Sequence, residues 1–398
     1  MIFDLFHSLS DTLVGSSLLG PNKVFKNFLN QAMLAEELGF DTLWLAESHF
    51  SSETQKKTSV ATIPQFQGEV GLNSDSYQWF HVLRNHTKKL NLGTGIHNIV
   101  GGSGGPIASA DRANTLNFIN QNLWSDSRTL RLGVAAGRFP YQNTCFGLVP
   151  RDEVERDLWG ALKRYHFLEA LEIFLRLLQG QSLASSQVAR YELTAEEVKK
   201  ALFEKWPKLE EKYSFPVAVR PRWDFEELKL VPEEASRENL RVVLGSHDPQ
   251  ALELGMKWWD LDLFNLSFTP PEQIDYLHKK LTKLCEGKER PWHRSRLPRT
   301  VLVFVDPDRK KAVALANQVI DTYIEAMRGT AQVPDKKILM ERALVGDASE
   351  VREQLSPENP RRFHADDRLM LWFEFNQIDN DAICRQMTYF SEQVIAKL

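Results

Sequence analysis

The sequence predicts a (β/α)₈ barrel, and three observations lead to that prediction. Short apolar runs alternate with longer amphipathic helical patterns, which is typical of a parallel α/β fold. There are eight such apolar runs, the strand number of a barrel. Polar or glycine-rich residues follow each run at its carboxyl end, where barrels of this class carry their chemistry. The length of 398 residues suits one barrel that carries an insertion.

The elements follow one another in a regular order. The strands are expected at residues 2–6, 42–46, 90–94, 130–134, 241–244, 262–266, 301–305 and 369–373. The helices are expected at residues 23–38, 108–120, 156–178, 249–258, 271–285, 309–327 and 380–397. Residues 180–239 break this alternation, so we expect an insertion between the fourth helix and the fifth strand. Within it, residues 192–213 are charged and predict a helix with a solvated face. We treat residues 1–398 as one domain.

Composition narrows the class of protein. A formal net charge of −4 is small for this length and argues against a nucleic-acid binder. The three cysteines, Cys145, Cys285 and Cys384, are far apart, which fits a reducing compartment and excludes a disulfide framework. No secretion signal is evident and no apolar run reaches the length of a membrane span, so we expect a cytoplasmic protein without membrane contact.

Residues 32–50 hold the catalytic candidates. A helical repeat ends at Gly39, where a left-handed capping residue is expected, and a buried strand follows. Glu47, Ser48 and His49 come directly after that strand. An imidazole with a near-neutral pKa suits general acid–base work, so His49 is the main candidate. The alternative is a histidine hydrogen-bonded within the barrel wall.

The segment at residues 245–249 predicts a binding site for an anion. Gly245 ends a strand, and Pro249 suits the first turn of a helix. Ser246 and His247 lie at this helix start, where exposed N–H groups attract negative charge. Asp248 is placed to be the N-cap, which is its ordinary structural role.

Two further strand ends are rich in small residues. Ala135 and Gly137 would let a flat ring lie against the backbone, and Arg138 follows as a positive charge or as one partner of a surface salt bridge. Gly95 lies in a Gly-Thr-Gly run that predicts a bulge or a close approach to a ligand. The glycine-rich residues 98–106 predict either a mobile loop near the active site or a surface loop without a role. No metal-ligand spacing of His and Cys occurs.

Five segments resemble, in the same order, the bacterial-luciferase-like flavin monooxygenases. They read AEELGFDTLWLAESHF, LNLGTGI, TLRLGVAAGRFP with a downstream FG, VVLGSHDPQALEL and RLMLWFEF. The resemblance implies a barrel that binds FMN, reduced by a separate flavin reductase, and that uses O₂ on a small organic substrate. It implies a homodimer, a phosphate contact at Ser246, and a non-proline cis peptide near the bulge at Gly95. The aromatics Phe50, Phe139, Tyr141 and Phe268 favour an apolar substrate.

The chain also departs from the luciferase pattern. Luciferases read E-H-H-F where this chain has Glu47, Ser48 and His49 before a phenylalanine, so Ser48 replaces their catalytic histidine. His49 instead matches a histidine of the deazaflavin-dependent branch. Luciferase has a cysteine and a phosphate-binding arginine where this chain has Ala135 and Ala136.

These departures leave several functions open. The first is an FMN-dependent monooxygenase in which Glu47, His7 or His97 assists His49. A hydride-transferring oxidoreductase with a deazaflavin coenzyme and a flavin-binding protein without turnover are alternatives. A barrel hydrolase with Glu47 and Glu374 as paired carboxylates is the fourth possibility.

Overall fold

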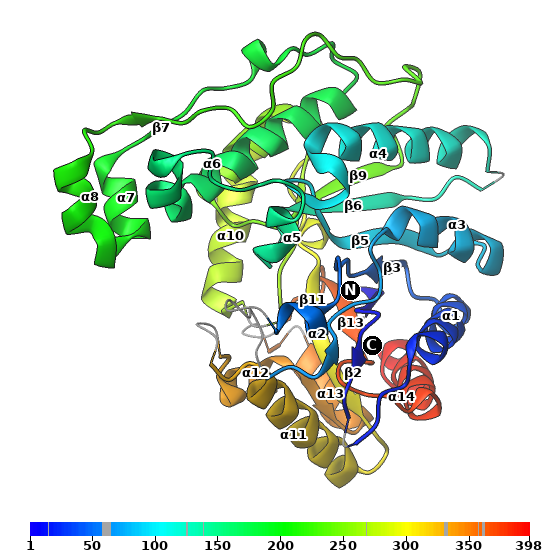
Figure 1. Ribbon diagram of the computed structural model, residues 1–398. Coiled ribbons are helices and arrows are strands. Elements are labelled where there is room, and N and C mark those ends of the chain that lie inside the picture. Colours follow the sequence, from blue (N-terminus) through cyan, green and yellow to red (C-terminus); the bar gives the residue numbers. More distant parts are fainter. Residues whose placement is uncertain are drawn as a thin grey trace.

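The strands form a parallel barrel, seen at the centre of Figure 1 with the helices around it. The computed structural model describes residues 1–14, 16–57, 65–124, 126–137, 139–267, 269–329, 333–356, 358–359 and 363–398. The barrel strands are β1 Ile2–His7, β3 Thr42–Leu45, β5 Asn91–Asn98, β6 Leu130–Ala135, β9 Leu240–Leu244, β10 Asp262–Leu263, β11 Arg299–Val305 and β13 Arg368–Trp372. All eight predicted strands are therefore present.

The order of the sheet is β10-β9-β6-β5-β3-β1-β13-β11-β12, and its strands pair in parallel. A parallel bridge between Asn265 and Arg299 joins the end of the β10 segment to β11, which closes the barrel. The additional strand β12, Leu344–Gly346, pairs only with the last three residues of β11. The barrel prediction is confirmed, because each strand has the neighbours that a closed parallel sheet requires.

Helices cover the outside of the sheet. The seven predicted helices are confirmed to within a few residues as α1 Pro21–Glu37, α4 Gly105–Asn122, α6 Glu153–Leu178, α9 Pro249–Trp258, α10 Pro271–Leu284, α11 Arg309–Ala326 and α14 Asn380–Gln393. Helices that the sequence did not predict include α2 Ser52–Gln55, α3 Ser76–His86, α5 Tyr141–Thr144, α12 Lys336–Arg342 and α13 Ala348–Leu355. Gly39, after α1, has a φ of 81°, as expected for a left-handed cap.

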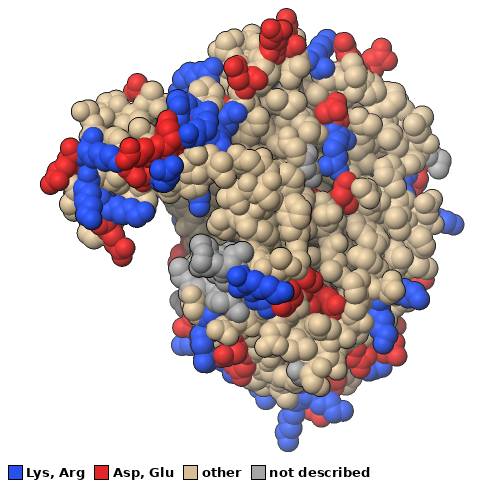
Figure 2. Space-filling view, in the orientation of Figure 1, with Lys and Arg blue, Asp and Glu red and all other residues tan. Residues whose placement is uncertain are grey.

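The segment between α6 and β9 projects from the barrel, at the upper left of Figure 1. It contains the antiparallel pair β7 Glu192–Leu193 and β8 Val217–Ala218, together with helices α7 Ala195–Ala201 and α8 Trp206–Lys212. The prediction of one helix over residues 192–213 is wrong. Residue Leu202 leaves the helical conformation at φ −129° and ψ 42°, and Pro207 starts a new helix. Figure 2 shows charges of both signs mixed over this projection.

The barrel interior is filled in layers. Near the amino ends of the strands, Arg368 places Nη1 2.7 Å from Asp4 and 2.6 Å from Asp41, and Arg131 lies 3.6 Å from Asp262. Above these charges lies an apolar cluster of Phe6, Trp44, Val243, Phe264 and Met370. The interior is therefore filled at these levels, and the space that remains for a ligand is the mouth at the carboxyl ends of the strands. In the described parts of the chain, no helix has both the length and the apolar character that crossing a membrane requires.

Candidate active site

A buried carboxylate joins two histidines at the ends of β3 and β5. Glu47 Oε1 accepts a hydrogen bond from His49 Nε2 at 3.0 Å, and both carboxylate oxygens lie 2.9 Å from His97 Nδ1. Burial alone would raise the pKa of Glu47, but the charges and hydrogen bonds of His97 and His49 outweigh it and lower the pKa to about 2. Glu47 is therefore an ionised acceptor shared by two imidazoles.

His97 completes a chain of contacts behind this carboxylate. Its Nε2 lies 3.0 Å from the hydroxyl of Ser109 on α4, and its ring stacks on Tyr77 of α3 with centroids 5.8 Å apart. Both nitrogens of His97 thus have protein partners. His49 differs, because among the described residues its ring has one hydrogen-bond partner, Glu47, at Nε2. With Nε2–H donated to the carboxylate, Nδ1 is the nitrogen left to accept a proton.

Ser48 is held between two loops. Its N–H donates to the carbonyl of Asn73 at 2.8 Å, and its hydroxyl accepts from the Gln142 amide at 3.1 Å. A Cβ on Gly71 would lie 2.9 Å from the Ser48 Cβ, so the position is closely packed. An amide does not take a proton from a hydroxyl, so this contact does not activate Ser48.

His7 lies on the helix side of the sheet, so the hypothesis that it assists His49 is wrong. Its ring centroid is 4.9 Å from that of Phe28 on α1, and its Nδ1 accepts the N–H of Leu9 at 3.0 Å. Burial lowers the pKa of His7, which favours the neutral ring. Glu374 receives the Ser8 hydroxyl at 2.8 Å and caps the end of β1. Nothing in these contacts supports paired hydrolytic carboxylates.

The predicted bulge lies in β5. The register of β5 against β6 shifts between Thr94 and His97, and the peptide between Gly95 and Ile96 is cis, as the resemblance implied. A Cβ on Gly95 would lie 2.8 Å from the ring of Phe6. Packing on the barrel interior therefore requires this glycine, and the next residue, Ile96, turns toward β9.

Three strand ends meet around Gly245, where the neighbouring side chains pack closely. A Cβ on Gly245 would lie 2.5 Å from Cδ1 of Ile96 and 3.1 Å from the Cβ of Ala135. The ends of β5, β6 and β9 therefore approach one another as closely as backbone and methyl groups allow. Gly137 has a φ of 81° and packs on the amide of Asn98. We refer to Ile96, Ala135 and Gly245 as the cradle.

The cradle leads into the start of α9. Asp248 caps this helix as predicted, accepting the N–H groups of Gln250 at 2.9 Å and Ala251 at 3.0 Å. The Ser246 hydroxyl accepts the N–H of Asp248 at 3.2 Å. His247 places Nε2 3.0 Å from the Phe264 carbonyl, and burial lowers its pKa, so its ring is a neutral donor. His247 can therefore contribute its backbone to an anion rather than a charge.

Arg164 is the functional candidate that the sequence did not reveal. It extends from α6 to place Nε 2.7 Å from Asp248, and its Nη1 lies 3.2 Å from Glu197 on α7. The sequence gives little signal for it, because Lys163 and Arg164 form an ordinary pair of charges in a predicted helix. Two earlier candidates, Arg138 and Phe268, lie outside the described residues.

The glycine-rich segment after β5 is packed, so the expectation of a mobile loop is not supported. A short turn at Gly102–Gly104 leads directly into α4. The side chain of Asn98 accepts the N–H groups of Val100 and Gly101, and Val100 is buried. A Cβ on Gly102 would lie 3.0 Å from His49 Nε2, so this segment covers the histidine.

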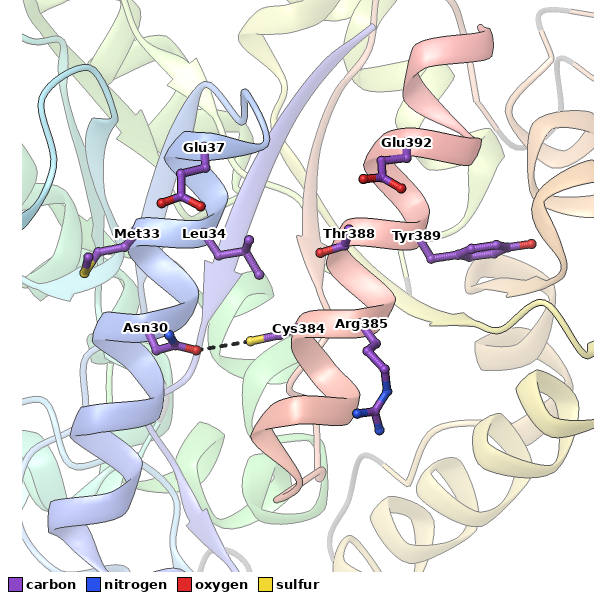
Figure 3. Close-up of a pocket in the computed structure, with 9 residues that line it drawn as sticks. All are labelled: Asn30, Met33, Leu34, Glu37, Cys384, Arg385, Thr388, Tyr389 and Glu392. Atoms are coloured by element: carbon purple, nitrogen blue, oxygen red, sulfur yellow. Dashed lines mark hydrogen bonds between the residues drawn. The ribbon is translucent and has the colours of Figure 1, made fainter.

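A groove of about 520 Å³ lies elsewhere, on the outer wall of the barrel. Figure 3 shows its lining residues on α1 and α14, with Cys384 directed to Asn30, whose Oδ1 is 3.3 Å from the thiol. None of these residues follows a barrel strand. The described residues also contain no group of three His, Cys, Asp or Glu side chains arranged to hold a metal.

Comparison with known proteins agrees with the barrel fold. No protein of curated function matches the chain in sequence. Monooxygenase RslO1 from Streptomyces bottropensis has a similar structure, with 17% identity, a TM-score of 0.69, and coverage of 100% of this chain and 99% of that chain. The oxygenating constituent of 3,6-diketocamphane monooxygenase from Pseudomonas putida, in complex with FMN, has 13% identity, a TM-score of 0.60, and coverage of 100% and 99%.

A third similar structure is an F420-dependent secondary alcohol dehydrogenase, with 14% identity, a TM-score of 0.52, and coverage of 99% of this chain and 98% of that chain. At these identities the structures show a shared fold. The family model described as luciferase-like monooxygenase matches residues 1–363. This chain belongs to the luciferase-like monooxygenase family.

Proposed function

We propose that the protein is a monooxygenase that uses reduced FMN and O₂ to oxidise an apolar organic substrate. One observation carries the proposal. The cradle of Ile96, Ala135 and Gly245 continues into Ser246 and the start of α9, so small residues at neighbouring strand ends lead directly to a helix start that would attract an anion. Reduced FMN supplies the electrons for oxygen chemistry when it is bound. A separate flavin reductase would provide it.

The phosphate group of FMN would lie at the start of α9. The Ser246 hydroxyl and the N–H groups of Ser246 and His247 are the donors at this position, and the helix dipole favours an anion there. Asp248 brings a negative charge close by, and Arg164 offsets it at 2.7 Å. Arg164 would thus supply the positive charge that luciferase provides with an arginine at the position of Ala136.

His49 would handle a proton beside the reacting centre. Glu47 keeps Nε2 of His49 occupied at 3.0 Å, so Nδ1 is presented as the base. Gly102 and Phe146 cover the ring, and such cover excludes water from the proton transfer. Ser48 fixes the loop through Asn73 and Gln142.

The second candidate is a deazaflavin-dependent hydride transfer. The observation that favours it is the pairing of His49 with Glu47, since His49 is the position that matches the deazaflavin branch. The same cradle would hold a flavin or a deazaflavin ring, so the two candidate functions differ in the reaction and not in the fold.

Labelled oxygen tests the proposal. The protein is mixed with reduced FMN, ¹⁸O₂ and either thioanisole or decanal as the probe, and the product is analysed by mass spectrometry. We expect one ¹⁸O atom in the product, dependent on the protein. A protein that binds flavin and labels neither probe, but reduces a ketone when supplied with reduced deazaflavin, would overturn it in favour of the second candidate.

A further inference from the structure

Phe50 and Phe146 form an exposed aromatic pair beside His49. Phe50 follows β3 and is 57% exposed, and Phe146 follows α5 and is 41% exposed. Their ring centroids are 5.6 Å apart. The centroid of His49 lies 6.2 Å from Phe50 and 5.8 Å from Phe146. Two residues almost a hundred positions apart in sequence thus converge on the catalytic candidate.

The backbone holds both rings in place. Phe50 has a φ of 64°, a conformation that a phenylalanine adopts only where its surroundings fix it. The next residue, Ser51, caps α2 by accepting the N–H of Thr54 at 3.1 Å. Phe146 donates its N–H to Asn143 at 3.1 Å, and Gly147 ends the turn at a φ of 83°. The two rings are therefore presented on ordered turns.

The exposure of two neighbouring aromatic rings to water is unfavourable, and a bound ligand would cover them. Large aromatic side chains are normally buried, and a contiguous exposed apolar patch marks a place where something binds. Figure 2 shows that the surface over α5 carries few charged side chains in this view. Because both phenylalanine rings lie within 6.2 Å of the His49 ring, a molecule bound on the patch would lie close to His49.

We infer that Phe50 and Phe146 select the substrate by binding an apolar ring or alkyl chain while His49 faces its reacting group. The inference rests on the proposed function for the identity of the reaction, and it adds the residues that set specificity. Phe146 stands nearly perpendicular to His49, at 86°, and Phe50 is tilted 44° to Phe146. An apolar group can contact both phenylalanine faces, whereas a charged group would lose its hydration there without a partner.

A neutral fluorescent probe tests the inference without turnover. N-phenyl-1-naphthylamine is titrated into the full-length wild type, the double variant Phe50→Ala/Phe146→Ala, and Phe203→Ala. Phe203 is the matched control, because it is 73% exposed on the distant projection. We expect the double variant to bind the probe roughly tenfold more weakly, as the loss of two aromatic contacts implies, and Phe203→Ala to match the wild type.

Two results would overturn the inference: probe affinity that is unchanged in the double variant, or an equal loss in Phe203→Ala. A conservative pair, Phe50→Leu/Phe146→Leu, should retain most of the affinity. FMN titration of the same variants is read separately. If the wild type fails to bind FMN while the probe result holds, the proposed function fails and the apolar site stands.

Discussion

At the scale of single residues, one carboxylate organises the active site. Glu47 contacts His49 and His97. The other nitrogen of His97 contacts Ser109, and its ring stacks on Tyr77. The sequence predicts Glu47 and His49 as neighbours because both follow one strand. It does not predict which nitrogen remains available on His49, because that depends on contacts across strands.

Replacing His49 should affect turnover more than cofactor binding. Positioned acid–base residues contribute about 10²–10⁴-fold, so we expect His49→Ala to lower turnover by at least about tenfold with little change in FMN affinity. Ser48→Ala should cause a smaller loss, since the Ser48 hydroxyl accepts from the Gln142 amide, which cannot take its proton. Steady-state oxygen uptake measures both. Normal turnover in His49→Ala, or a larger loss in Ser48→Ala, would contradict the assignment.

Glu47 should also make stability depend on pH. Its pKa falls from 4.5 to about 2 in the folded protein, so its ionised form stabilises the fold fully above about pH 4.5. That contribution disappears as the pH falls toward about 2. In urea denaturation, the difference in unfolding free energy between wild type and Glu47→Gln should narrow over this window. A difference that stays constant there would show that Glu47 is not held by the histidines.

At the scale of elements, the junction of β9 with α9 depends on a third element. Gly245, Ser246 and Asp248 are predictable, because strand end, cap and helix start follow one another in sequence. Arg164 comes from α6. A local sequence pattern shows which helix a residue belongs to, but it does not show which distant residue the side chain contacts. The same limit applies to His7, whose strand position is right but whose side chain faces α1.

Ser246→Asp should weaken FMN binding. A carboxylate next to the phosphate meets like charge, and we expect at least about a tenfold loss of affinity, on the order of 1.4 kcal/mol. Arg164→Met should also weaken binding, and Arg156→Met is the matched control, because Arg156 is exposed on the same helix. Flavin fluorescence titration reports all three variants. Equal affinity in Ser246→Asp and wild type would remove the phosphate from this site.

At the scale of the whole molecule, a layer of buried charges and the candidate active site lie at opposite ends of the barrel. The alternation of strands and helices is readable from the sequence, so the eight strands and the barrel were predictable. The charged layer of Asp4, Asp41, Arg131 and Arg368 was not, because closing the sheet brings together residues from distant strands. It lies at the amino ends, away from the cradle.

Arg368→Met should therefore destabilise the fold and leave the cofactor site intact. Removing one partner of a buried ion pair typically costs about 3–5 kcal/mol. The control Arg309→Met breaks an exposed pair with Glu350, which water screens, and should cost much less. Urea denaturation gives both values. An Arg368→Met protein as stable as the control would show that the layer does not support the barrel.

A comparison of FMN with riboflavin, which lacks the phosphate, tests most directly whether the barrel mouth is a flavin site. The cradle predicts that the wild type binds both, and the start of α9 predicts that FMN binds at least about tenfold more tightly, a difference of about 1.4 kcal/mol. In Arg164→Met this preference should fall toward equality. Equal affinity of the wild type for FMN and riboflavin would contradict the phosphate site, and binding of a deazaflavin coenzyme but not FMN would contradict the proposed reaction.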